Sequence, residues 1–87
     1  MDRIIEELRE VLYDVFLEEI DPGKDVSLVE AFHADSFDLV EIMVALENRF
    51  GIEIEVEDMV HFSGTGTIVA YLTRRLAEIN EWIAGKE

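Results

Sequence analysis

Three stretches of this chain repeat apolar residues at the spacing of an α-helix, with charged residues between them. This spacing gives each helix one apolar face, which is stable only when it is buried against another element. We therefore expect the fold class to be all-α. The apolar faces consist of Ile4, Ile5, Leu8, Val11, Leu12, Val15 and Phe16 in the first stretch, Leu39, Ile42, Met43, Leu46 and Phe50 in the second, and Ile68, Leu72, Leu76, Ile79 and Ile83 in the third.

Turn-forming residues separate these stretches. The first helix is expected to end before Asp21-Pro22-Gly23, whose turn residues stop a helix. Asp35 is the expected N-cap of the second helix, which begins at Asp35 or Ser36. Gly51 occupies the C′ position that stops it. The second helix is therefore bounded on both sides by residues that favour these positions.

The segment between the second and third helices contains two different patterns. Residues 52–56 alternate with period two and could form a strand. Because no other segment offers a partner strand, we expect an extended connector whose isoleucines dock into the core. Residues 57–61 are expected to form one short helical turn, and Thr65 or Thr67 is expected to cap the third helix.

A long connection, residues 17–35, joins the first helix to the second. Its apolar residues Leu28, Val29 and Phe32 are expected to hold it against the core. Loops of this length in small domains are often functional. The predicted fold is a small helical bundle of three main helices plus one short helix, with a long loop between helices one and two. We expect residues 1–87 to form a single domain.

The chain carries a formal net charge of −14, from 21 acids against 7 bases, and the acids are spread along its whole length. Nucleic acid is a poor partner for such a surface, because binding phosphates requires clustered Lys and Arg. A protein with a basic patch is a better partner. The charge also serves to keep a small domain in solution.

The chain contains no cysteine, which excludes disulfides, zinc-thiolate sites and a cysteine nucleophile. Any thioester chemistry would need a thiol from an added group. No apolar run approaches the roughly 20 residues of a membrane span, so we expect no membrane insertion. The N-terminus has no signal or transit character. We expect a cytoplasmic, free-standing protein.

Ser36 is the candidate functional residue. A serine at a helix N-terminus faces unpaired backbone N–H groups and the positive end of the helix dipole, and both favour an attached phosphate. The alternative is that Ser36 only satisfies backbone donors as part of an ordinary helix start.

The residues around Ser36 resemble one family. His33-Ala34-Asp35-Ser36-Phe37-Asp38-Leu39-Val40-Glu41, then Ala45-Leu46-Glu47 and Phe50-Gly51-Ile52-Glu53-Ile54, closely resemble the acyl carrier proteins. The similarity runs without a gap from Ser27 to Ile54 and continues more faintly through residues 65–69.

This resemblance implies that Ser36 carries a 4′-phosphopantetheine arm, derived from coenzyme A, whose thiol holds acyl groups as thioesters. It implies that Asp35 helps the phosphopantetheinyl transferase bind its metal and coenzyme A. It further implies a carrier with no catalytic residue of its own, which presents its cargo to fatty acid, lipid or polyketide-type biosynthetic enzymes.

The outer face of the second helix is the expected docking surface. By resemblance, Asp38, Glu41 and Glu47 would meet basic patches on acyl-transferring and acyl-modifying enzymes, around an apolar centre. Phe37, Val40 and Val44 supply that centre, and exposed apolar patches often mark contact sites. The alternative is an ordinary solvated face. We expect the protein to be a monomer.

Some residues depart from the family pattern. Phe37 stands where leucine is usual, His33 where glycine is usual, and Asn48 and Arg49 dilute the acidity at the end of the helix. Trp82 lies in a C-terminal extension that we expect to pack on the domain. These departures indicate a specialised carrier.

The sequence argues against two other kinds of site. His33, Asp35 and Ser36 are near neighbours without a nucleophile elbow, so a hydrolase is disfavoured. His33 and His61 lack ligand spacing, so we expect no metal site. An aminoacyl or peptidyl carrier, and an unmodified helical interaction module, remain as alternatives.

Overall fold

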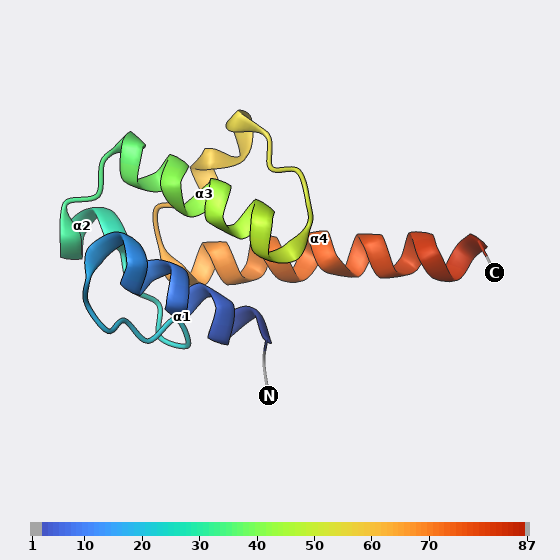
Figure 1. The fold of residues 1–87 in the computed structure, drawn as a ribbon, viewed down its shortest axis with the longest axis horizontal. Coiled ribbons are helices and arrows are strands. Elements are labelled where there is room, and N and C mark those ends of the chain that lie inside the picture. Colours follow the sequence, from blue (N-terminus) through green and yellow to red (C-terminus); the bar gives the residue numbers. More distant parts are fainter. Residues whose placement is uncertain (1–2, 87) are drawn as a thin grey trace.

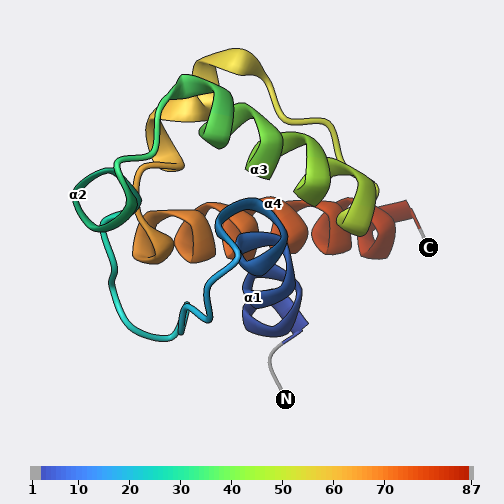
Figure 2. The same ribbon diagram turned by 60° about the vertical axis from the view of Figure 1, so that its left-hand side comes forward.

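The described residues form five helices. The computed structural model describes the backbone of residues 3–86 and the side chains of residues 3–79. In order, the helices are α1 (Arg3–Phe16), α2 (Leu28–Phe32), α3 (Ser36–Phe50), the 3-10 helix η1 (Val56–His61) and α4 (Thr65–Lys86). The long helices α1, α3 and α4 pack around one core, with α2 at one end and η1 beside α3 and α4 (Figures 1 and 2). The all-α prediction is confirmed, and none of the described helices is long and apolar enough to cross a membrane.

Helix α2 is an element that the sequence patterns did not predict. It lies inside the segment that we expected to be an unbroken loop. Ser27 caps it by accepting a hydrogen bond from the Glu30 N–H at 3.2 Å. With five residues it is too short to show a helical period. The count of three main helices plus one short helix was therefore wrong by one short helix.

The apolar residues of this segment differ in how deeply they are buried. Leu28 is fully buried, and the ring of Phe32 stacks on Phe16 of α1 with centroids 5.1 Å apart. Val29, in contrast, is 43% exposed, so the prediction that it holds the segment against the core was wrong. Two side chains thus fix α2 to the bundle, while Val29 points outward.

Thr65 joins the long connection to the start of α4. Its buried hydroxyl accepts from the Val26 N–H at 2.9 Å and donates to the Lys24 carbonyl at 2.6 Å. The backbone adds a bond from the Leu28 N–H to the Ser63 carbonyl at 2.8 Å. The expectation that Thr65 or Thr67 caps α4 was wrong, because Thr65 binds the connection and Thr67 donates to the carbonyls of His61 and Gly64.

The connector after α3 follows the prediction except at Val56, which is the first residue of η1 and not the last residue of the connector. Gly51 has a left-handed backbone with φ of 64° and ends α3. Residues 52–55 form no strand, and Ile52 and Ile54 are buried. The buried core consists of Leu8, Val11, Leu12, Ile20, Leu28, Ala34, Leu39, Ile42, Met43, Leu46, Ile52, Ile54, Phe62, Ile68, Tyr71 and Leu72.

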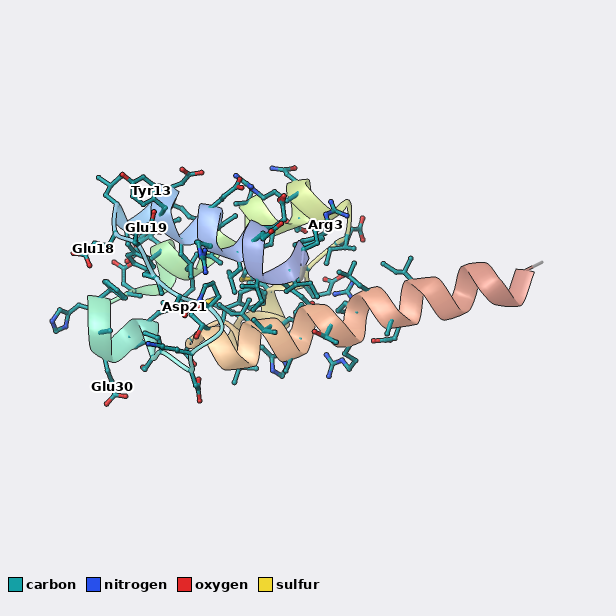
Figure 3. The ribbon with its side chains drawn as sticks, turned by 90° about the horizontal axis from the view of Figure 1, so that it is seen from below. Arg3, Tyr13, Glu18, Glu19, Asp21 and Glu30 are labelled. Atoms are coloured by element: carbon teal, nitrogen blue, oxygen red, sulfur yellow. The ribbon has the colours of Figure 1, made fainter. Side chains whose placement is uncertain are left out.

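Burial decreases along α4. Ile68 and Leu72 are fully buried, Leu76 is half-buried and Ile79 is 37% exposed. Figures 1 and 3 show the C-terminal half of α4 extending past the other helices. The side chains of Trp82 and Ile83 lie outside the described residues, so the expected packing of the extension stays a prediction.

Arg49, in the last turn of α3, holds α1 and α3 together. Its guanidinium lies 3.2 Å from Glu7, 2.7 Å from Glu10 and 3.6 Å from Asp14, all on α1. The hydrogen bond with Glu10 is the largest cause of a raised pKa for Arg49, and Glu7 adds to it against the effect of burial. Arg3 reinforces the contact by donating to the Arg49 carbonyl at 3.1 Å. One cation therefore offsets the repulsion among three carboxylates of α1.

We expect Arg49→Ala to lower the free energy of unfolding by about 1–2 kcal/mol, because it leaves three neighbouring carboxylates without their shared cation. Arg49→Lys should lose less, because an ammonium keeps the charge but not the planar fork. Urea denaturation at low and high salt measures both, and the loss should shrink as salt rises. The control is Arg9→Ala, which removes the same charge from an exposed pair with Asp21. An equal loss in Arg49→Ala and Arg9→Ala would contradict the conclusion that Arg49 holds α1 and α3 together.

Two exposed residues, Leu17 and His33, adopt left-handed backbone conformations, with φ of 57° and 55°. This conformation costs an L-residue roughly 1–2 kcal/mol relative to glycine. The structure therefore gives a physical reason for the glycine that is usual at position 33 in the resembled family: His33 ends α2 as its C-cap.

We expect Leu17→Gly and His33→Gly each to raise the free energy of unfolding by up to about 1 kcal/mol, since relief of backbone strain exceeds the added entropy of the unfolded chain. Thermal unfolding measures the change. Leu17→Ala and His33→Ala keep a Cβ and serve as controls that should give no gain. If the glycine variants melt lower than the alanine variants, backbone strain is not the governing factor.

Candidate functional site

Ser36 is the first residue of α3, and its side chain is exposed. The preceding Asp35 is the N-cap, as predicted, with an extended backbone. Its carboxylate accepts from the Asp38 N–H at 3.0 Å, and the Asp38 carboxylate accepts from the Asp35 N–H at 3.1 Å. This reciprocal capping box fixes where the helix begins, and it therefore fixes Ser36 in the first turn.

The first turn of α3 is suited to a phosphate on Ser36. The first helical bond in this turn runs from the Leu39 N–H to the Asp35 carbonyl. The N–H groups of Ser36 and Phe37 precede it, so they have no partner within the helix. Together with the helix dipole they favour a negative group at the exposed hydroxyl. The residues present thus fit a phosphodiester at this position.

The outer face of α3 exposes the predicted apolar residues. Phe37 is 79% exposed, Val40 39% and Val44 48%. Glu41 lies among them and is also exposed. An apolar centre with an exposed carboxylate beside it is therefore present where the sequence predicted it.

The other two carboxylates predicted to dock partners, Glu47 and Asp38, accept backbone hydrogen bonds within the domain. Glu47 is half-buried, and its carboxylate accepts from the Ile54 N–H at 2.8 Å, which holds the connector against the end of α3. Asp38 is half-buried in the capping box. Of the three acids named for docking, Glu41 is the exposed one. Arg49, in the last turn of α3, is directed at carboxylates of α1.

Helix η1 adds residues that the sequence analysis missed. Val56 and Val60 are 62% and 75% exposed. Together with Leu39 of α3 and Met59 they line an open hollow of about 400 Å³, with Glu57 and Ser63 completing its rim. Val56 and Val60 are four residues apart, a spacing that puts both side chains on one face of a helix. The predicted helical turn, residues 57–61, did not include Val56. The apolar surface therefore extends from α3 to η1.

A second hollow, of about 310 Å³, lies on the side of α1. It is lined by charged residues of α1 and by Glu19 and Arg49. Since Arg49 is bound to carboxylates of α1, this hollow is part of the contact between α1 and α3. Within the described part of the chain, no group of three or more acidic or histidine side chains could hold a metal ion.

Acidic residues gather at the end of the molecule that contains α2. Figure 3 shows Glu18, Glu19 and Asp21 around the end of α1 and Glu30 on α2, with Arg3 at the opposite end of α1. The α3 start that carries Ser36 follows α2 after a three-residue link. In the first turn of α3 itself, the acids beside Ser36 are Asp35 and Asp38.

Comparison with known proteins identifies the family. Residues 2–72 match the family described as "Phosphopantetheine attachment site", a range that includes Ser36. An acyl carrier protein of Rhodococcus erythropolis is 33% identical over 78 residues, which cover 88% of this chain and 86% of the relative. Acyl carrier proteins of Solidesulfovibrio magneticus and Nitratidesulfovibrio vulgaris are 30% and 34% identical, over 86% and 80% of this chain and 97% and 93% of their own lengths. The chain therefore belongs to the acyl carrier protein family, whose members carry phosphopantetheine.

Proposed function

We propose that Ser36 is the attachment point of the 4′-phosphopantetheine arm, and that the protein presents acyl thioesters on this arm to biosynthetic enzymes. The observation that carries this proposal is the capping box of Asp35 and Asp38, which holds an exposed Ser36 in the first turn of α3. The arm supplies the thiol that the cysteine-free chain lacks.

In this proposal the protein positions Ser36 and the arm attached to it. The carboxylates of Asp35 and Asp38 bind backbone N–H groups, so they are occupied in shaping the helix start. The partner enzymes then supply the acids and bases of the reaction. Asp35 has a second role as a contact for the phosphopantetheinyl transferase, which family resemblance supports.

The docking surface in this proposal is the outer face of α3 together with η1. Phe37, Val40 and Val44 form its centre on α3, and Val56 and Val60 continue it on η1. Glu41 provides an exposed charge within it. A partner with an apolar centre and Lys or Arg at the edge would complement this surface, and the edge charges would chiefly raise the association rate.

We expect incubation with coenzyme A and a broad-specificity phosphopantetheinyl transferase to increase the intact mass by one phosphopantetheine. Ser36→Ala should abolish the gain, because it removes the acceptor hydroxyl. Thr73→Ala is the control, since it removes an exposed hydroxyl from α4, outside the docking surface, and it should keep the gain. An unmodified wild-type protein would favour the alternative of an unmodified helical interaction module.

We expect Glu41→Lys to weaken recognition by the same transferase, because it reverses the exposed charge on the docking surface. The loss should be about 1 kcal/mol, roughly fivefold in kcat/KM at low salt, and it should diminish at high salt. Glu18→Lys makes the same change of net charge beyond the end of α1 and serves as the control. A salt-independent effect, or equal effects of both variants, would count against α3 as the docking helix.

A further inference from the structure

Helix η1 is attached to the domain although it has no fully buried residue. None of the residues Val56–His61 is fully buried, and Val56 and Val60 face outward. Helices of small domains normally hold their place by burying an apolar face. In η1 the apolar attachment comes from Met59, which is partly buried against the core, and polar contacts add to it.

The polar contacts converge mainly on Tyr71 of α4. The Tyr71 hydroxyl donates to the Asp58 carboxylate of η1 at 2.6 Å and accepts from the Arg75 guanidinium. The Tyr71 ring stacks on His61 with centroids 5.4 Å apart. Burial raises the pKa of the Tyr71 phenol, and its hydrogen bond to Asp58 raises it further, against the opposing effect of Arg75. The Tyr71 phenol thus joins η1 to α4, together with the hydrogen bond that the Thr67 hydroxyl donates to the His61 carbonyl at 2.7 Å.

Arg75 extends this network to the connector that leads into η1. Its guanidinium donates to the Glu53 carbonyl at 2.6 Å and lies 3.8 Å from the Asp58 carboxylate. The Asp58 and Arg75 side chains are 30% and 25% exposed, so water reaches both. Polar contacts that water reaches are individually weak and can exchange with solvent.

The opposite side of η1 covers part of the core. Met59 packs against the core cluster, and Leu39 of α3 belongs to that cluster. Both line the hollow of about 400 Å³ between η1 and α3. Movement of η1 away from α3 would expose these two apolar side chains to anything that enters the hollow.

We propose that Asp58, Tyr71 and Arg75 form a latch that holds η1 closed against α4, and that release of this latch moves η1 while α1, α3 and α4 stay folded. The three residues are positioning residues. This proposal rests on the proposed function of Ser36. The latch sets how readily an acyl chain on the arm of Ser36 reaches the apolar interior beside Leu39.

The test on the unmodified protein is amide hydrogen exchange, followed by NMR. The Asp58 N–H binds the Glu55 carbonyl and the Phe62 N–H binds the Met59 carbonyl, each at 2.9 Å, so both amides report on η1. Tyr71→Phe keeps the ring and removes the hydroxyl. We expect exchange at these two amides to rise at least tenfold, with a smaller change in the core amides of α1 and α3.

Two further variants sharpen this test. Tyr13→Phe removes an exposed phenol from α1 and should leave exchange in η1 unchanged. Asp58→Asn keeps an acceptor for Tyr71 but removes the charge that faces Arg75, and it should give a smaller rise than Tyr71→Phe. A uniform rise across all helices, or no rise in η1, would overturn the latch.

The part of the proposal that concerns cargo has its own readout. With the protein loaded with an octanoyl thioester, Tyr71→Phe should slow thioester hydrolysis, because the opened interior shelters the chain more often. Hydrolysis at the wild-type rate or faster would overturn this part. A failure to load the wild-type protein at Ser36 would instead refute the proposed function, and the exchange experiment on unmodified protein would still test the latch.

Discussion

The reciprocal hydrogen bonds between Asp35 and Asp38 are the constraint on which the site depends. They fix the first residue of α3, and the helix then runs without interruption to its left-handed cap at Gly51. Because a helix start sets the phase of every later residue, the same two bonds decide which side chains of α3 enter the core and which face solvent. Ser36, Phe37 and Val40 are exposed for this reason, while Leu39 is buried.

In a chain with a net charge of −14, the few basic residues pair with acids and carbonyls inside the domain. The described arginines make contacts within the domain: Arg49 binds α1, Arg75 binds Asp58 and the Glu53 carbonyl, and Arg9 and Arg74 pair with neighbouring acids. Internal pairing at these points reduces repulsion where segments approach one another. The basic residue of α3, Arg49, is thereby directed at α1, so that Glu41 on the outer face of α3 keeps its negative potential for a basic partner.

Stability is distributed unevenly across the fold. The three long helices share one apolar core, and the long connection is tied to α4 through the buried hydroxyl of Thr65. Helix η1, in contrast, has no fully buried residue and is held by the contacts of Tyr71, the packing of Met59 and a hydrogen bond from Thr67. Segments with few buried contacts open at lower free energy than the core does. The domain therefore combines a rigid start for α3 with a more weakly held wall beside it.

The sequence by itself determined the three long helices, the docked isoleucines of the connector, the Asp35 cap and the position of Ser36, because local periodicity and capping chemistry act within a few residues. The tertiary structure alone decided the roles of Glu47, Arg49, Thr65 and η1. Thr65 reaches 39 residues back to Val26, and Arg49 reaches 42 residues back to Glu7. A polar side chain has no period that reveals such a distant partner, so its role appears only when packing brings the two segments together.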